Sequence, residues 1–525
     1  MASPKRVAII GAGTSGLAAI KQCLDEGLIP VCFEQDNFTG GLWRYTEVTP
    51  ENPNPHSSVY KSITINTSKE MMCYSDFPIP TSWPTFLPNQ LVAHYFDLYA
   101  FNFDLLRHIR FQRRVIQCSQ LGDKRWRVRT VNAKDTQAEP EDDVFNYLMV
   151  CTGHHSKPRW PNPVFKGTEE FKGEMRHSHF YRVPYPDVNK RILVLGVGNS
   201  GVDLAVELCQ HASQVYLSTR SGTWVAPRQT LFGKTLDHVI TRWMTFLPKV
   251  LLNYFWMLIL AMAVGRLKGP LKPRHFFFSA HITINSELIG KINTGRVIVK
   301  PNIRRLGPGK RVEFDDGTIE EGIDIVYFCT GYHIEFSFLD KEIVNGGKED
   351  VDLENNEVWL YKNIFPPRFE NIAFIGLVQP LGAIMPISEM QSRYTLSFWL
   401  GRLGSAPTIP VMDEWIRRYR QIQQRIYVRS PRHTIQISYH SCMDMLAEDL
   451  GCRPTLWRLG KEFGWNPRLI WCVYSGPLTP CQYRLVGPQK WKGAKRAVEE
   501  YCGYKWPGNY GDEKSGFWFD KKARE

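Results

Sequence analysis

The sequence predicts an α/β protein with two nested domains, each built on a parallel sheet. Two stretches, RVAIIGAGTSG at residues 6–16 and RILVLGVGNSG at residues 191–201, place a glycine-rich turn after a short apolar run. Two later apolar runs, at residues 147–153 and 324–331, end in the same CTG turn. A strand, a GxGxxG turn and a helix together open a Rossmann-like dinucleotide-binding unit. The repetition therefore predicts two such units, the second inserted in the first.

The first unit begins close to the start of the sequence. Val7–Ile10 predict a strand, Ser15–Leu24 have helical spacing, and Ile29–Phe33 predict a second strand. Glu34 ends that strand roughly twenty residues after the glycines, where an acid accepts the ribose hydroxyls of a dinucleotide. The cofactor-binding residues predicted at this turn are Gly11, Ala12, Gly13, Thr14, Ser15 and Gly16.

The second unit repeats this order with Arg191–Leu195, a helix through about Cys209, and a strand at Gln214–Leu217. Thr219 and Arg220 stand where an acid would be expected. A guanidinium can hold the 2′-phosphate of NADP with a fork of hydrogen bonds, whereas a carboxylate would repel it. The amides that open the helix are expected to face the pyrophosphate. The predicted binding residues are Gly196, Gly198, Ser200, Gly201, Val202, Asp203 and Arg220.

Two sites of different chemistry predict two cofactors. The acid-ended site suits FAD and the arginine-ended site suits NADPH, so hydride could pass from nicotinamide to flavin. A disulfide reductase would also bind both, but it needs a CxxC dithiol, and the twelve cysteines contain none. The sequence therefore predicts a flavoprotein oxidoreductase with free thiols and no metal site.

The order of the strands predicts four segments. Strand-like NIAFIGLVQPLGA, at residues 371–383, indicates that the chain returns to the first domain after the second is complete. The predicted segments are residues 1–155 for the first part of the FAD domain, 156–330 for the NADPH domain with an apolar insertion around 230–300, 331–445 for the second part of the FAD domain, and 446–525 for a C-terminal extension.

Composition and charge narrow the class of protein. The chain has 525 residues, 43% of them hydrophobic, which is typical of a globular protein with large cores. Its net charge of +13 comes from scattered lysines and arginines, a pattern that does not favour nucleic-acid binding. The first ten residues lead straight into a strand and leave no room for a secretory signal, so we expect the protein to face the cytosol.

One uncharged segment, VLLNYFWMLILAMAVG at residues 250–265, stands apart. It is about one helical turn shorter than the roughly twenty residues that span a membrane. A buried core helix and a helix or loop pair resting in a membrane interface, with Lys249, Arg266 and Lys268 at the headgroups, are equally good interpretations, and a true span is the remaining alternative. The stretch from about Trp491 is polar and aromatic, and we expect it to contain no apolar anchor.

Several motifs identify a family resemblance. Phe171, Lys172, Gly173, His177, Ser178 and Tyr181 form FKGxxxHSxxY, just before the second glycine-rich turn. This closely resembles the identifying sequence of the flavin-containing monooxygenases. EQDNFTGGLW at 34–43, NTSKEMMCYSDFP at 66–78, TRSGTW at 219–224 and FCTGY at 328–332 are similar to further motifs of that family. The resemblance runs from residue 4 to about residue 490, and the segments at 375–394 and 432–436 look most like its vertebrate fifth isoform.

The resemblance implies a reaction cycle and further site residues. NADPH reduces FAD, and dioxygen then forms a flavin carbon-4a hydroperoxide that oxygenates a soft nitrogen or sulfur centre of a small amine or sulfide. Asn66 matches the asparagine beside the flavin, although an Asn opening NTSKE could equally cap a helix. Location on the cytosolic face of the endoplasmic reticulum membrane, through a peripheral or interfacial contact, is also implied. The further cofactor-binding residues are Gly41, Leu42, Trp43, Ile65 and Thr67.

The resemblance leaves alternatives open. The fifth isoform is associated with Baeyer–Villiger oxidation of ketones, whereas Tyr181 stands where Baeyer–Villiger enzymes have Trp. An NADPH oxidase that releases hydrogen peroxide and a catalytically silent flavoprotein would share the same cofactor motifs. Asp203 could be a first-turn acid without a ligand, and we expect His177 to be structural. Cys329 replaces the usual alanine of FATGY, which would place a thiol close to the flavin. Substrate identity and oligomeric state stay open.

Overall fold

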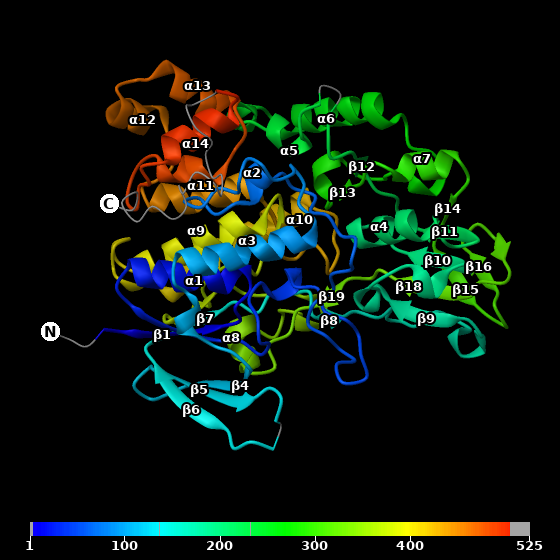
Figure 1. Ribbon diagram of the computed structural model, residues 1–525, viewed down its shortest axis with the longest axis horizontal. Coiled ribbons are helices and arrows are strands. Elements are labelled where there is room, and N and C mark those ends of the chain that lie inside the picture. Colours follow the sequence, from blue (N-terminus) through cyan, green and yellow to red (C-terminus); the bar gives the residue numbers. More distant parts are fainter. Residues whose placement is uncertain (1–3, 136, 231–232, 505–525) are drawn as a thin grey trace.

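The computed structural model describes residues 4–504 except 136 and 231–232, and it contains two parallel sheets that lie apart along the long axis (Figure 1). The first sheet has the order β20-β7-β1-β2-β3. All of its neighbouring strands pair in parallel. Its strands are β1 (Arg6–Ile10), β2 (Ile29–Phe33), β3 (Ile109–Arg110), β7 (Tyr147–Val150) and β20 (Ile372–Phe374).

The second sheet is also parallel and has the order β14-β11-β10-β18-β9. Its strands all come from between residues 174 and 328, whereas β20 returns to the first sheet afterwards. The predicted fold class, with one nucleotide-binding unit inserted in the other, is therefore confirmed. The strands are β9 (Glu174–His177), β10 (Arg191–Leu195), β11 (Gln214–Ser218), β14 (Val297–Lys300) and β18 (Ile325–Phe328).

The two connections between the units also pair with each other. β8 (Lys157–Pro158) leads out of the first unit and β19 (Tyr332–His333) leads back, and the two form an antiparallel pair. The predicted domain boundaries, near residues 155 and 330, fit this pairing and stay a prediction.

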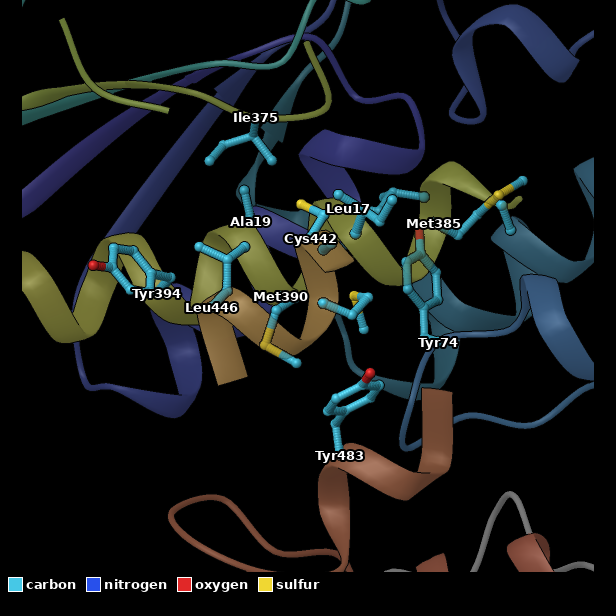
Figure 2. Packing of buried hydrophobic residues seen from close by; sticks show 14 of the residues in the cluster. Leu17, Ala19, Tyr74, Ile375, Met385, Met390, Tyr394, Cys442, Leu446 and Tyr483 are labelled. Atoms are coloured by element: carbon cyan, nitrogen blue, oxygen red, sulfur yellow. The ribbon is translucent and has the colours of Figure 1, made fainter. Parts of the chain in front are cut away.

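The largest core surrounds helices that cover the first sheet. α1 (Thr14–Asp25) follows β1 and packs against the long α9 (Ile384–Trp399), which is buried along most of its length. Figure 2 shows Leu17 of α1, Met390 of α9 and Leu446 of α11 (Tyr439–Asp449) in one cluster. Apolar contacts from residues far apart in the sequence thus fix the glycine turn after β1.

Some elements lie outside the sequence predictions. β4 (Arg113–Gln120), β5 (Trp126–Asn132) and β6 (Glu141–Phe145) form a three-stranded antiparallel sheet inserted before β7. α12 (Leu456–Phe463), α13 (Pro467–Ser475) and α14 (Ala494–Tyr501) pack on the main core. The polar stretch from Trp491 therefore contains a packed helix up to residue 501, and residues 505–525 lie outside the described part of the chain.

The uncharged segment forms α6 (Lys249–Val264) at an edge of the molecule (Figure 1). Val250, Leu251, Leu258 and Met262 are each more than half exposed, while only Trp256 and Leu260 are buried. The interpretation as a core helix is therefore wrong. Within the described residues, no helix combines the length and apolar character that crossing a bilayer requires. The interfacial interpretation stays a prediction.

Candidate functional site

The first glycine-rich turn lies at the carboxyl end of β1. Gly11 has φ +96°, and a Cβ atom there would lie 2.9 Å from the carbonyl oxygen of Cys151, the first residue of the CTG turn after β7. A Cβ atom on Gly16 would lie 1.8 Å from the Gly11 carbonyl oxygen. Both positions require glycine because backbone atoms occupy the space that a side chain would take.

Glu34 joins the end of β2 to this turn. Its Oε2 atom accepts a hydrogen bond of 2.7 Å from the Ala12 amide, and its Oε1 atom accepts one of 2.9 Å from the Asp36 amide. Burial raises the pKa of the Glu34 carboxyl, and these backbone amides oppose that rise. Each carboxylate oxygen keeps a lone pair for a further donor. The arrangement can hold ribose hydroxyls beside the turn.

A second glycine pair closes over the turn. Gly40 and Gly41 both have positive φ values, +100° and +50°, and lead into the short helix η1 (Gly41–Trp43). A Cβ atom on Gly41 would lie 3.0 Å from the Cα atom of Gly13. The two bare backbones therefore pack closely against each other, and a side chain on Gly41 would crowd Gly13.

A cavity of about 700 Å³ opens from this turn. Gly40 and Gly376 line it together with most residues that the sequence predicts for the flavin site. The predicted residues on its wall are Gly11, Gly13, Thr14, Ser15, Glu34, Gly41, Leu42, Trp43, Ile65, Asn66 and Thr67. Ala12 and Gly16 lie behind the wall, where the Ala12 amide binds Glu34 and Gly16 lets α1 pack on the turn.

This cavity fits FAD by the chemistry of its wall. The turn after β1 brings the first amides of α1 to the cavity beside Gly11 and Gly13, as a pyrophosphate requires. Glu34 supplies acceptors for ribose, and Arg113 and Arg114 add positive charge on the same wall. The cavity has the size of a cofactor-binding cleft rather than that of a packing defect.

Asn66 lines the middle of the cavity. Its Oδ1 atom is buried and has no hydrogen-bond partner among the described residues. Helix α2 (Lys69–Met72) begins after Ser68, so Asn66 does not cap it. The capping interpretation is therefore wrong, and a buried amide without a partner indicates a group that awaits a ligand.

The far end of the cavity is apolar and belongs to the insertion. Trp256 of α6, Phe277 and Phe278 of η8 (Phe277–Ser279), and Ile282 line it. The sequence leaves the substrate open and singles out none of these residues. The wall also includes a stretch that the sequence analysis missed, Gln379–Met385, because only β21 (Gln379–Leu381) and the start of α9 bring it there.

Asp237 is the acid at this apolar end. It lies in α5 (Leu236–Val239), lines the cavity, and its Oδ2 atom accepts a hydrogen bond of 2.7 Å from the Ser68 amide. Its Oδ1 atom is buried without a partner among the described residues. Sequence spacing gives no signal for Asp237, since it enters the site only through the fold of the insertion.

The second glycine-rich turn repeats the first. Gly196 has φ +113°, and a Cβ atom there would lie 2.7 Å from the carbonyl oxygen of Cys329. A Cβ atom on Gly201 would lie 1.9 Å from the Gly196 carbonyl oxygen. Cys329 thus lies against the second turn and not on the cavity wall, so the expectation of a thiol beside the flavin is wrong. Burial raises the pKa of the Cys329 thiol to about 12.

Helix α4 (Asn199–Leu208) starts at this turn, and its first amides are available to a ligand. The Val202 amide is an exception, because it donates to the Gly198 carbonyl oxygen at 3.0 Å. The Asp203 carboxylate accepts hydrogen bonds from the Tyr60 hydroxyl at 2.9 Å and the Asn285 amide at 2.8 Å. The expectation that Val202 and Asp203 contact the pyrophosphate therefore fails, while Ser200 and Gly201 keep that position.

Arg220 lies directly after β11, and its side chain is exposed. The carbonyl oxygen of nearby Ser218 accepts a hydrogen bond from the Gly196 amide, so the end of β11 borders the glycine turn. Ser218, Thr219 and Arg220 are consecutive, so no acid stands at this end of the strand. The place is the one that a 2′-phosphate would occupy beside this turn.

His177 and Tyr181 are buried away from the cavity wall. His177 is fully buried, and its Nδ1 atom accepts the His179 amide at 3.1 Å. Burial lowers its pKa to about 4, so the imidazole is neutral. Tyr181 is buried between the rings of Tyr60 and Tyr327. Neither lines the cavity, in agreement with the structural role expected of His177.

Comparisons with known proteins agree with this geometry. The profile of a family described as flavin-binding monooxygenase-like matches residues 4–502. Flavin-containing monooxygenase 5 of Rattus norvegicus is 42% identical over 505 residues, which cover 94% of this chain and 91% of the relative. The structure of S-allyl-L-cysteine S-oxygenase from Allium sativum has a TM-score of 0.65 at 24% identity and covers 85% of this chain and 89% of that one. A structure of OTEMO in complex with FAD and NADP has a TM-score of 0.59 at 18% identity, covering 82% and 94%.

Proposed function

The chain belongs to the flavin-binding monooxygenase family, and from that premise we propose that it oxygenates the nitrogen or sulfur atom of small lipophilic nucleophiles. It is a flavoprotein monooxygenase, an oxidoreductase whose cofactors are FAD and NADPH and whose co-substrate is dioxygen. The proposal adds the substrate class and the residues that serve it.

One observation carries the proposal. A single cavity is lined by the glycine turn after β1, by Asn66, and by an aromatic chamber formed by Trp256, Phe277 and Phe278. A cofactor held at Glu34 would therefore share its space with a substrate held among aromatic rings. Bound FAD would supply the redox chemistry, taking hydride from NADPH and activating dioxygen.

The residues of the chain bind, orient and exclude water. Gly11, Gly13 and Glu34 would hold the dinucleotide part of FAD, and Gly41 would close over it. Asn66 would place its side-chain amide against the reacting end of the cofactor, with hydrogen-bond capacity that the protein leaves unused. The apolar chamber would keep water away from the oxygen that is transferred.

The second glycine turn would bind NADPH. Ser200 and Gly201 offer amides at the start of α4, and Arg220 offers a cation at the end of β11. Since the chain has no acid at that end, NADPH is preferred over NADH.

A ketone is the second candidate substrate. The relative that is 42% identical is a fifth isoform. The resemblance of this chain to that isoform implies Baeyer–Villiger oxidation. The experiment that separates the candidates supplies NADPH and dioxygen with a tertiary amine, a sulfide or a ketone, and identifies the product. N-oxide and sulfoxide without ester support the proposal, and ester formation at a higher rate favours the ketone.

We also propose that the protein rests on a membrane surface, on the cytosolic face of the endoplasmic reticulum. Phe246, next to α6, is 69% exposed, and Trp471 of α13 is 62% exposed. A bridge between Thr241 and Pro477 joins the segment before α6 to the segment after α13. Exposed aliphatic and aromatic side chains beside Lys249, Arg266 and Lys268 are typical of helices in a lipid interface.

A further inference from the structure

Arg432 lies over the second glycine turn, although it belongs to the other nucleotide-binding unit. It follows α10 (Ile409–Ile426) and precedes β22 (Gln436–Ser438), which pairs in parallel with β21 just after β20 of the first sheet. We propose that the Arg432 guanidinium binds the pyrophosphate of NADP(H) from across the cleft between the two units. This role rests on the proposed use of NADPH.

The geometry fixes the position of the guanidinium. A Cβ atom on Gly198 would lie 2.5 Å from Nη2 and 2.7 Å from Nη1 of Arg432. Gly198 is the N-cap of α4, so the guanidinium lies across the end of the helix that presents its first free amides. Gly198 is the glycine whose bare backbone lets a pyrophosphate approach. The same anion would meet amides from one unit and a cation from the other.

The guanidinium is not used by the protein itself. Within the described chain, no carboxylate pairs with it and no carbonyl or side chain accepts from it; only the Arg432 amide makes a hydrogen bond, to Ser430. The Arg432 side chain is exposed, so water hydrates its charge. A diphosphate would replace that water with charge-assisted, forked hydrogen bonds.

The groups around Arg432 add no negative charge. Its titratable neighbours are Cys329, His155, His281 and His433. Burial, together with the charge of Arg432, lowers the pKa of His155 to about 4 and that of His281 to about 3. These imidazoles are neutral near pH 7, and burial holds Cys329 as a thiol. Among the residues that the structure describes, no carboxylate therefore compensates this positive charge.

Two arginines would then divide the recognition of one ligand. Arg220 stands at the end of β11, where the 2′-phosphate is expected, and Arg432 stands at the start of α4. The division predicts that the two respond to different parts of the nucleotide. NADP⁺ carries both groups, NAD⁺ carries the pyrophosphate alone, and 2′-AMP carries the 2′-phosphate alone.

The test measures binding to the oxidised, FAD-loaded full-length protein by calorimetry, with no turnover. Arg432→Ala is expected to weaken the binding of NADP⁺ and of NAD⁺ by the same factor, about tenfold to hundredfold, as for a lost hydrogen bond to a charged group. The affinity for 2′-AMP should stay unchanged. Arg220→Ala should weaken the binding of NADP⁺ and of 2′-AMP and leave the affinity for NAD⁺ unchanged. Arg432→Lys, which keeps the charge without the fork, should fall between.

Arg429→Ala is the matched control, because Arg429 is an exposed arginine in the same loop. It should bind all three ligands as the unaltered protein does. Unchanged NADP⁺ binding in Arg432→Ala, or an equal loss of 2′-AMP, would overturn the pyrophosphate role. If the unaltered protein retains FAD but binds no NADP⁺, the assignment of NADPH itself fails, and this role fails with it. Flavin absorbance in every variant shows whether the fold is intact.

Discussion

The Oε2 atom of Glu34 lies 2.7 Å from the amide nitrogen of Ala12, which donates a hydrogen bond to it. This contact ties the end of β2 to the glycine turn after β1, across the mouth of the cavity. One side chain thus shapes the turn and supplies acceptors to a ligand. The sequence indicates only the second of these roles.

Glu34→Gln is expected to weaken FAD binding by about tenfold or more. The new amide would point an N–H group at either the Ala12 or the Asp36 amide, so a buried hydrogen bond is lost and two donors face each other. FAD titration of the flavin-free protein measures the effect. Glu321→Gln, at a carboxylate whose side chain is 68% exposed, is the control. Equal FAD affinity in both variants would contradict the role of Glu34.

Asn66→Asp is expected to separate cofactor binding from oxygenation. The shape is retained, but the amide donor is lost and a charge is placed beside the reacting end of the cofactor. We expect normal flavin content, product formation reduced about 100-fold, and NADPH oxidation that yields hydrogen peroxide. Product and peroxide assays on the same sample measure both. Unaltered product formation would remove Asn66 from the site.

Gly16→Ala and Gly201→Ala form a matched pair in the two turns. The added Cβ atom would lie 1.8 Å from the Gly11 carbonyl oxygen in the first and 1.9 Å from the Gly196 carbonyl oxygen in the second. We expect the first variant to lose FAD, and the second to keep FAD but lose NADP⁺ binding. Gly290→Ala, which meets nothing within 4 Å, should affect neither. Loss of FAD in both turn variants alike would show general unfolding rather than two separate sites.

Leu258→Glu combined with Met262→Glu tests the membrane surface. These side chains of α6 are 60% and 54% exposed, so the change should leave the fold intact. Co-sedimentation with vesicles that contain anionic lipid should fall at least severalfold, since two apolar contacts become charges. The pair Ile422→Glu and Val428→Glu, at apolar positions outside α6 that are 51% and 42% exposed, is the control. Equal binding by both pairs would exclude α6 as the contact.

Asp444 gives a prediction for acid stability. Burial alone would raise its pKa, but the contacts of His440 and the charge of Arg242 lower it well below the ordinary 3.8. Its folded-state pKa is depressed, so its stabilisation is present above about pH 4 and is lost as pH falls through the lower, folded-state value. Asp444→Asn should cost about 3 kcal/mol at pH 7. Denaturant unfolding at pH 7 and pH 3 should show this difference shrinking in acid, and a constant difference would contradict it.

Local patterns predicted much of the fold and of the flavin site. β1, β2 and β10 and the glycines after β1 and β10 lie where the sequence predicts them, because each depends on a few consecutive residues. Glu34 was recognisable from its distance to the glycines. The fold class followed because the same unit occurs twice.

Residues brought in by tertiary contacts could not be predicted. Asp237 and Gln379–Met385 line the cavity only because distant segments fold against it. Arg432 carries no motif of its own. The exposure of α6 depends on which neighbours pack on it, and apolar composition gives the same signal for a core helix and a surface helix.

The most direct test of the account is the amount of oxygenated product formed for each NADPH oxidised, with a lipophilic sulfide in air-saturated buffer. We predict close to one sulfoxide per NADPH and little hydrogen peroxide, because the aromatic chamber and the cofactor site share one cavity. NADPH consumption that yields only hydrogen peroxide, with no sulfoxide, would contradict the proposed oxygen transfer.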